Sequence, residues 1–405
     1  MKYFHTLLIL GISLTLCSQS YNVKGNLLWE ISTPNGISYL FGTLHSNDKR
    51  LFEFPDSVYE SFLRSKKLAV EVNVFDLFMD KDPIPNRSLL LLDKRGKLYT
   101  SNEEPTVTYY GNEDGMPQFM DAWFQEKAEL LNKEIIALES IAQQTKAIEE
   151  IPYVEKENNI SLALSDKQVL HELYLDGRID LIDRLIKGGL SGNKEAYIKL
   201  IENRNVAIAA NIARYCMDGP VFFAVGAGHL YGEKGLLSLL REKGYKLRPI
   251  QLTKGDTPSA SERKIKSMRS YEFSRELRNS WIKFSVPGRP RETQSATEAE
   301  TILTYKELGQ GNTYEVRYFE RDTSLSLLEY SEILIASPPQ SPYVFGVLDD
   351  GTEFTQGLSD AYPEGLKWTR ILINETYVLV ASCSGGNKFM NSDRPRRFFN
   401  NILLE

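Results

Sequence analysis

The sequence has little cysteine and little histidine, and both scarcities restrict its chemistry. The three cysteines, Cys17, Cys216 and Cys383, stand far apart in a chain of 405 residues, so neither a disulfide scaffold nor a CxxC zinc site is expected. Metal ligands, if any, must then be histidines and carboxylates. The sequence also lacks an HExxH motif and a GxSxG motif, which excludes ordinary zincin chemistry and argues against a serine hydrolase.

The chain also lacks an excess of positive charge and a long apolar run. Lys and Arg number 48 against 54 Asp and Glu, which gives a net charge of −6, so we expect no nucleic acid partner. The most apolar stretch, 7–16, is too short to cross a bilayer, which takes roughly 20 residues. Lys2 before it and the small residues up to Ser20 after it predict a signal peptide over residues 1–20.

The signal peptide predicts an exported protein of the periplasm or cell envelope. Cleavage after Ser20 would release a soluble chain. Lipid attachment at Cys17 is the alternative, and in that case the membrane is a partner only through the anchor.

Strand and helix patterns alternate through the region 21–252. A glycine-containing turn at 33–36 predicts a hairpin, and Pro55 and Asp56 mark a helix start. The alternation predicts an α/β or α+β domain, a mixed sheet flanked by helices. Residues 81–115 carry no such pattern and suggest a flexible insertion. The predicted strands are 27–32, 37–41, 68–72, 135–138, 221–225 and 246–252, and the clearest later helices are 116–133, 193–217 and 233–243.

The composition changes after residue 252. Residues 253–270 combine Gly, Pro, Ser and basic residues without an apolar period, as an interdomain linker does. Beyond them, β-rich runs separated by turn residues predict a smaller accessory α+β domain over 271–405. This last region contains no histidine, so the candidate site residues lie in the first domain.

Two histidines stand in the same local frame. Gly42-Thr43-Leu44-His45 follows one predicted strand, and Gly226-Ala227-Gly228-His229 follows another. A glycine at the carboxyl end of a strand lets the chain turn sharply, and α/β sheets place their sites at these ends. Two loop histidines that bond nearby carbonyls are the plainer explanation. His171 has no such frame and is expected at the surface.

Two glutamates occupy equivalent places. Glu71 and Glu139 each end a short apolar strand, so both are expected at the sheet edge that holds His45 and His229. Either one alone is more often a solvated strand end. Together, two imidazoles and two carboxylates suit a divalent transition metal with an open position for water.

Arg204 lies on the apolar stripe of the helix predicted over 193–217. Its side chain can extend along that stripe to the surface. The alternative is that its guanidinium holds a site carboxylate or an oxyanion at the sheet edge. Asn205 beside it is a candidate to orient a ligand.

The residues around these positions resemble the TraB/GumN family, which includes the Tiki proteases. The resemblance covers about residues 25–252 and implies a mixed-sheet α/β domain. For the Tiki branch it also implies metal-dependent peptidase activity that needs both GxxH histidines and the glutamate. It rests on the segments around His45, Glu71, Glu139 and Arg204-Asn205, and on the string 225–236.

The leading hypothesis is therefore an exported metal-dependent hydrolase that cleaves a peptide or protein substrate. In it, His45, Glu71 and His229 bind Mn, Co or Zn, and the metal activates a water molecule. Glu139 relays the proton and Arg204 stabilises the oxyanion.

Two alternatives stay open. In a metal-free variant, one histidine acts as general base on water and the glutamates orient it. In the other, the protein is a non-catalytic binding protein of the cell envelope that captures a metal, haem or peptide at the same sheet edge.

Overall fold

The structure is a computed structural model of the whole chain. It describes residues 26–46, 48–75, 107–108, 111–112, 119–149, 167–190, 194–268, 272–273, 275–278, 282–294, 300–308, 312–335, 342–348, 350–361 and 365–404. The predicted signal peptide and most of the predicted insertion at 81–115 lie outside these residues. No helix in the described ranges is long and apolar enough to cross a membrane.

The first part of the chain forms a six-stranded sheet. The predicted hairpin is confirmed: β1 (Leu28–Thr33) pairs antiparallel with β2 (Gly36–Thr43), and Thr33 faces Gly36 across the turn. Gly36 has a φ of 129°, a backbone conformation that glycine adopts without strain. The order in the sheet is β6-β3-β7-β2-β1-β8, completed by β3 (Lys67–Val70), β6 (Glu134–Ala137), β7 (Val221–Gly226) and β8 (Lys246–Pro249).

Four neighbouring strands of this sheet run in the same direction. β2 pairs parallel with β7, β7 with β3, and β3 with β6. Their carboxyl ends therefore meet at one edge, as the placement of the candidate site residues requires.

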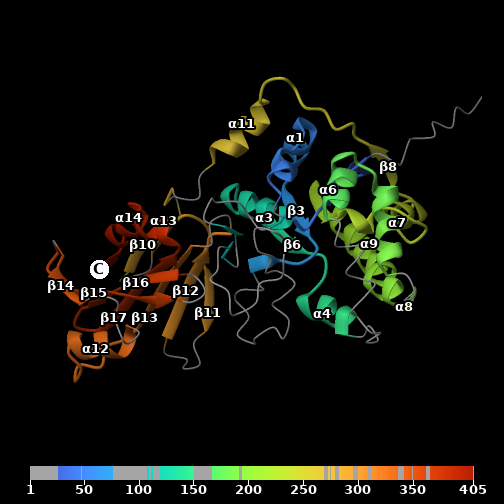
Figure 1. The fold of residues 1–405 in the computed structure, drawn as a ribbon. Coiled ribbons are helices and arrows are strands. Elements are labelled where there is room, and N and C mark those ends of the chain that lie inside the picture. Colours follow the sequence, from blue (N-terminus) through green and yellow to red (C-terminus); the bar gives the residue numbers. More distant parts are fainter. Residues whose placement is uncertain are drawn as a thin grey trace, which may run out of the picture.

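Helices cover the sheet and enclose an apolar core. α1 (Asp56–Arg64) and α3 (Met120–Leu130) bring Phe62 and Phe124 against Phe222 of β7, with ring centroids 5.4 and 5.1 Å apart. α9 (Asn203–Cys216) and α10 (Leu236–Glu242) pack against each other and against β7 and β8. Figure 1 shows the sheet between α3 and α9. We call this sheet with its helices the six-stranded unit.

The segment predicted as a linker contains packed structure. α11 (Ala260–Ser267) begins after Ser259, whose side chain caps its first turn, and it lies against α1. Ile265 of α11 belongs to the core of the six-stranded unit. The interdomain linker over 253–270 stays a prediction, and within this segment one short helix docks through Ile265.

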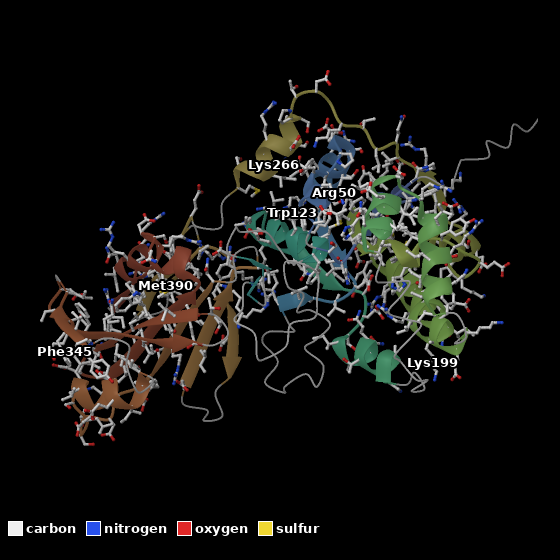
Figure 2. All side chains as sticks on the ribbon, in the orientation of Figure 1. Arg50, Trp123, Lys199, Lys266, Phe345 and Met390 are labelled. Carbon is white, nitrogen blue, oxygen red and sulfur yellow. The ribbon has the colours of Figure 1, made fainter. Side chains whose placement is uncertain are left out.

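The chain from 272 to 404 forms two antiparallel sheets, which we call the seven-stranded unit. The larger sheet has the order β11-β12-β13-β17-β16-β15-β14, and the smaller has the order β18-β10-β9. At the edge of the larger sheet, β14 leaves Val344, Phe345 and Val347 exposed; Figure 2 labels Phe345. The strands are β9 (Arg275–Arg278), β10 (Ile282–Val286), β11 (Arg291–Gln294), β12 (Glu300–Lys306), β13 (Thr313–Glu320), β14 (Val344–Val347), β15 (Glu353–Ala361), β16 (Gly365–Ile373), β17 (Tyr377–Gly385) and β18 (Leu403–Leu404), with helices α12 (Leu327–Leu334), α13 (Asn387–Met390) and α14 (Arg394–Asn400).

The two units touch along α3. Leu308 of the seven-stranded unit is fully buried in a small apolar cluster with Val74, Phe75, Phe119 and Ala122 of the six-stranded unit. Near this cluster, Arg291 lies 3.3 Å from Glu129 of α3. The expected fold class is confirmed: a mixed sheet with flanking helices is followed by a separate, sheet-rich region with helices.

Candidate functional site

The candidate residues stand directly after the four parallel strands. Glu71 follows β3 by one residue, His45 follows β2 by two, and Glu139 follows β6 by two. His229 ends the short helical turn η5 (Ala227–His229) after β7. The sheet therefore delivers all four side chains to the same edge.

Arg204 joins the two glutamates. Its Nη2 donates to Glu71 Oε2 at 2.9 Å and to Glu139 Oε1 at 2.5 Å, and its Nε donates to Glu139 Oε2 at 2.9 Å. Its Nη1 donates to the Leu200 carbonyl at 3.1 Å. Only 13% of the Arg204 side chain is exposed. Of the two alternatives for Arg204, the structure shows the one in which the guanidinium holds site carboxylates.

A widened helical turn precedes Arg204. The predicted helix over 193–217 is present as α8 (Lys194–Tyr197), the π-helical turn η4 (Ile198–Glu202) and α9, one after another. A π turn inserts an extra residue and changes which side of the helix the following residues face. Such turns are frequent at functional sites.

The two glutamates differ in their pKa. Burial opposes the ionisation of Glu71. The charge that His229 carries at acidic pH, the charge of Arg204 and the Gly226 N–H, 2.6 Å from Oε1, outweigh burial and lower the pKa of Glu71 to about 2. For Glu139 burial outweighs the attraction of Arg204, so its pKa is raised. Glu71 is therefore a fixed carboxylate, whereas Glu139 holds a proton more readily.

Asn205 fixes the orientation and the tautomer of His229. Its Nδ2 donates to the carbonyls of His229 and Lys234 at 3.3 and 2.8 Å, so its Oδ1 is the atom 2.6 Å from His229 Nδ1. Because an amide oxygen only accepts, Nδ1 carries the proton and Nε2 keeps its lone pair. Nε2 lies 3.7 Å from Glu71 Oε1. Asn205 thus orients a histidine in this structure.

Burial also keeps His229 neutral. It lowers the pKa of the imidazole to about 4, although the Glu71 carboxylate acts in the opposite direction. A neutral imidazole whose Nε2 keeps its lone pair can bind a metal ion near pH 7.

His45 stands at the rim with a different partner. Half of its side chain is exposed, and its Nε2 lies 3.3 Å from Asp121 Oδ2. Burial lowers the pKa of His45, but the charge of Asp121 acts in the other direction and raises it to about 9. The ring also packs on Phe119, with centroids 5.2 Å apart.

The sequence analysis did not find Asp121. It is buried in the first turn of α3, in the otherwise apolar run Phe119-Met120-Asp121-Ala122-Trp123. A carboxylate among residues that face a core must have a partner or a function. The position of Asp121 within this apolar segment was the sequence feature that could have identified it as a candidate site residue.

The expectation that His171 is a surface histidine is wrong. It lies on α6 (Lys167–Leu175) with 13% of its side chain exposed. Its Nε2 is 2.8 Å from Ser46 Oγ, and its Nδ1 is 3.2 Å from Asp48 Oδ2. His171 therefore holds the loop that carries His45, a tertiary contact that no local pattern indicates.

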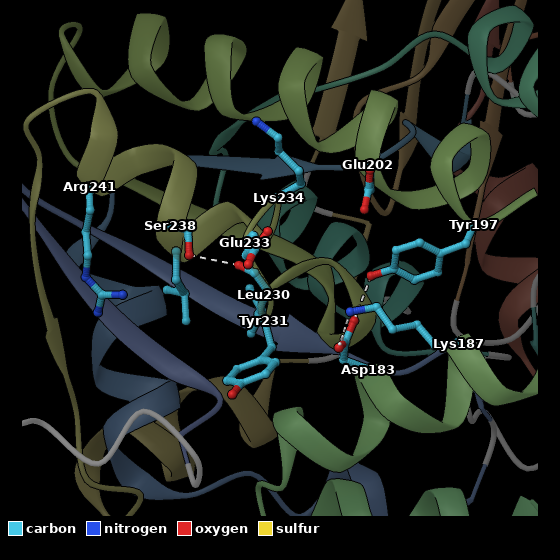
Figure 3. Close-up of a pocket in the computed structure, with 12 residues that line it drawn as sticks. Asp183, Lys187, Tyr197, Glu202, Leu230, Tyr231, Glu233, Lys234, Ser238 and Arg241 are labelled. Carbon is cyan, nitrogen blue, oxygen red and sulfur yellow. Dashed lines mark hydrogen bonds and ion pairs between the residues drawn. The ribbon is translucent and has the colours of Figure 1, made fainter. Parts of the chain in front are cut away.

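A cleft of about 470 Å³ borders the loop that follows His229. Leu230, Tyr231 and Lys234 of that loop form one side of it. On another side, Tyr197 donates a hydrogen bond to Asp183 at 2.7 Å, and Lys187 of α7 (Ile179–Gly189) lies 2.8 Å from the same carboxylate (Figure 3).

The donor atoms suit a divalent metal, although their present positions do not enclose one. Within the described ranges, no three His, Cys, Asp or Glu side chains lie close enough together to hold a metal ion as they stand. Among the described residues, the carboxylate oxygens of Asp121 have no hydrogen-bond partner, although Oδ2 lies 3.3 Å from His45 Nε2, and His229 Nε2 has only Glu71 Oε1 near it, at 3.7 Å. Imidazole and carboxylate donors of this kind fit Mn, Co or Zn.

A known protein family matches the part of the chain that carries these site residues. A family model described as TraB/PrgY/gumN matches residues 27–102 and 106–249, more than half of the 405 residues. The chain belongs to the TraB/PrgY/gumN family. All six predicted site residues, and Asp121 as well, lie within the matched ranges.

Individual proteins outside this family model give no further indication of function. A search of curated proteins finds no match. Among solved structures, part of the chain is similar to the solution structure of cyanobacterial PsbP (CyanoP) from Synechocystis sp. PCC 6803, with 8% identity and a TM-score of 0.26 over 32% of this chain and 92% of that chain. This likeness is too low to support a statement about fold or function.

Proposed function

We propose that this TraB/PrgY/gumN family member is a metal-dependent hydrolase that cleaves peptides. The observation that carries the proposal is His229, a buried neutral imidazole whose Asn205 contact leaves Nε2 free beside the ionised Glu71. Sites of this kind at the carboxyl edge of an α/β sheet are typical of enzymes.

Each residue has a stated task in the proposal. His45, Glu71 and His229 would hold the metal, and a bound metal would supply a water of lowered pKa, toward ~7, and a Lewis acid for the substrate carbonyl. Glu139, whose pKa is raised by burial, accepts and returns the proton. Arg204 keeps both carboxylates in place.

Arg204 has little capacity left for the oxyanion. A guanidinium has five N–H groups, and four of them are used by Glu71, Glu139 and Leu200. Counting the contacts of the described residues, one Nη1 hydrogen is left for a substrate oxygen. We therefore propose that Arg204 acts mainly on the glutamates and adds one hydrogen bond to the oxyanion.

The cleft beside the His229 loop is proposed to bind a part of the substrate away from the reacting groups, because its lining residues do not include the six proposed site residues. Its volume of about 470 Å³ lies within the ~300–1,000 Å³ that is usual for ligand sites. Charged residues of both signs line it, among them Asp183, Lys187 and Arg241, which suits a peptide with polar side chains.

Metal analysis combined with peptide cleavage tests the proposal. Protein purified without chelator should contain Mn, Co or Zn, and chelation should abolish cleavage until the ion is returned. His229→Ala should lose both properties, whereas Arg214→Met, at an exposed position of α9, should keep them. Cleavage that survives chelation would favour the metal-free variant. Full metal occupancy without cleavage would favour the binding protein.

We also propose export to the periplasm or cell envelope, on the basis of the signal pattern at 1–20. The mature chain should begin near Tyr21 or at a lipidated Cys17. Amino-terminal sequencing and mass measurement of the envelope fraction check this, and an intact Met1 in a cytoplasmic pool would contradict it.

A further inference from the structure

The helix α3 lies between the two units of the molecule (Figure 1). Met120 and Phe124 belong to the core of the six-stranded unit. The opposite face turns toward the seven-stranded unit, and its residues recur at intervals of three and four, as residues of one helix face do. These residues are Phe119, directly before the helix, Ala122, Glu126 and Glu129. Because both faces are covered, contacts from both units hold α3.

Leu308 is the residue of the seven-stranded unit that packs at the start of α3. It is fully buried in one apolar cluster with Phe119 and Ala122. Val74 and Phe75, from the segment after β3, complete this cluster. Truncation of a buried leucine leaves a cavity into which its neighbours relax only in part. Leu308 therefore supports side chains that belong to the six-stranded unit.

The same helix start holds the segment that carries His45. The Phe119 ring packs on the His45 imidazole with centroids 5.2 Å apart. Asp121 Oδ2 lies 3.3 Å from His45 Nε2. The backbone N–H of Leu44 donates to Met120 Sδ at 3.4 Å. Three successive residues at the start of α3 thus fix the loop and the ring of His45.

Other contacts keep the rest of α3 in place. Arg291 of β11 lies 3.3 Å from Glu129, and its guanidinium lies 4.0 Å from the centre of the Phe75 ring. Gln125 Oε1 accepts a hydrogen bond from the Val74 N–H at 2.8 Å. A loss of the Leu308 side chain should therefore act on the start of the helix and not along its whole length.

We propose that Leu308 is a positioning residue for His45. It supports Phe119 and the start of α3 against the segment that carries His45, and so sets the orientation of the imidazole. Close-packed interiors transmit such contacts, because they have few voids to absorb a displacement. The inference rests on the proposed function for its effect on cleavage. It makes the seven-stranded unit a structural part of the site, although no proposed site residue lies in that unit.

Leu308→Ala in the full chain tests the inference. We expect kcat for peptide cleavage to fall about 10-fold, because a misplacement of ~1 Å by a change far from the reacting atoms can cost as much as ~100-fold. KM should stay unchanged, since neither α3 nor the seven-stranded unit lines the cleft proposed for the substrate. Leu308→Met, which nearly conserves the volume of the side chain, should keep the wild-type kcat.

The NMR signals of the histidine rings report the position of His45 without reference to activity. The ring protons of His45 lie beside Phe119, so the ring current of Phe119 affects their chemical shift. In protein with ¹³C-labelled histidine at one pH, Leu308→Ala should move the His45 signals, and those of His171 and His229 should stay. The His45 signals are assigned by their absence from His45→Ala.

Leu372→Ala is the matched control. Leu372 is a fully buried leucine of the same unit, and the buried residues of its apolar cluster all belong to the seven-stranded unit. Its truncation should lower the melting temperature, as that of Leu308 does, and should leave kcat and the His45 signals unchanged. If Leu308→Ala does not fold, Leu308→Val removes only one methylene group and should change kcat and the signals in the same direction.

The other outcomes overturn the inference or separate it from the proposed function. If the His45 signals stay in folded Leu308→Ala, or move equally in Leu372→Ala, Leu308 does not position His45 and the inference is wrong. If they move while kcat stays normal, the link to the reaction is wrong and the proposed function stands. If the wild type cleaves no peptide, the proposed function fails, and the histidine signals alone decide this inference.

Discussion

In each unit of the molecule an arginine with little exposed surface bonds to glutamate side chains. The residues around these two arginine clusters differ. In the six-stranded unit, Arg204 bridges Glu71 and Glu139 beside His229. In the seven-stranded unit, Arg394 of α14 bonds Glu307, which is fully buried, and the Tyr314 hydroxyl at 3.0 Å. Asn312 donates to the same glutamate at 3.0 Å.

The difference follows from strand direction. Parallel strands end at one edge, so residues from separate parts of the chain, with their backbone turns and histidines, meet there. In the antiparallel sheet the neighbouring strand ends alternate, and the sequence after residue 270 offers no histidine. The Arg394 cluster therefore pins α14 to the sheet, while the Arg204 cluster adjoins groups that exchange protons or bind ions. A buried ion pair alone does not indicate a site.

The largest expected effect is the loss of peptide cleavage when a histidine beside the Arg204 cluster is replaced. His45→Ala and His229→Ala should each lower metal-dependent peptide cleavage by ~100-fold or more, and the double variant should add little, because residues that act as a unit are not additive. Arg394→Met should leave cleavage by the folded fraction unchanged. The check is kcat/KM together with metal content; normal values in both histidine variants would refute a shared site.

Next in size is the loss of stability on removing either arginine. Arg204→Met leaves two buried carboxylates without their counterion and should cost about 3–5 kcal/mol of unfolding free energy. Arg394→Met leaves one, so its cost should be smaller. Denaturant titration of both variants measures this.

A double variant checks the reason for that loss. Adding Glu139→Gln to Arg204→Met removes one uncompensated charge and should recover part of the lost stability. If it recovers none, the cost lies in packing and not in the unpaired charge.

A smaller effect is expected at His171. Because it holds Ser46 and Asp48 beside His45, His171→Ala should weaken metal binding by ~10-fold, as losses of supporting contacts do. Its effect should stay below that of His45→Ala. Titration calorimetry decides, and an unchanged affinity would show that the loop keeps His45 in place without this contact.

The smallest effect concerns the contact between the units. Glu126 of α3 is buried; burial raises its pKa, Lys127 acts in the opposite direction, and Glu307 of the seven-stranded unit adds to the rise. A carboxyl with a raised pKa in the folded protein contributes stability that is fully present below its unfolded pKa, about 4.5, and is lost as the pH rises through the raised value.

The unfolding free energy should thus carry a falling component above pH ~4.5 that comes from Glu126. Glu126→Gln, which cannot ionise, should remove this component. Denaturation of both proteins from pH 4.5 to 7 compares the slopes, and identical slopes would contradict the raised pKa.

Local patterns predicted much of the six-stranded unit. The hairpin, the start of α1 at Asp56 and the capping contact between Ser140 and Gln143 before α4 (Ile141–Glu149) are all present. Each of these features is set by residues that are close together in the sequence. The types and spacing of those residues therefore predict it. The convergence of His45, Glu71, Glu139 and His229 was also predictable, because a parallel sheet brings strand ends together.

The sequence by itself therefore determined the strands, the edge at which they end and the histidines and glutamates placed there. Only the tertiary structure decided the partners: Asn205 for His229, both glutamates for Arg204, Asp121 for His45 and His171 for the loop after β2. The physical reason is that these partners lie far apart along the chain. A turn or strand end is set by adjacent residues, whereas Asp121 and His171 reach the site on helices whose docking depends on the packing of the whole core.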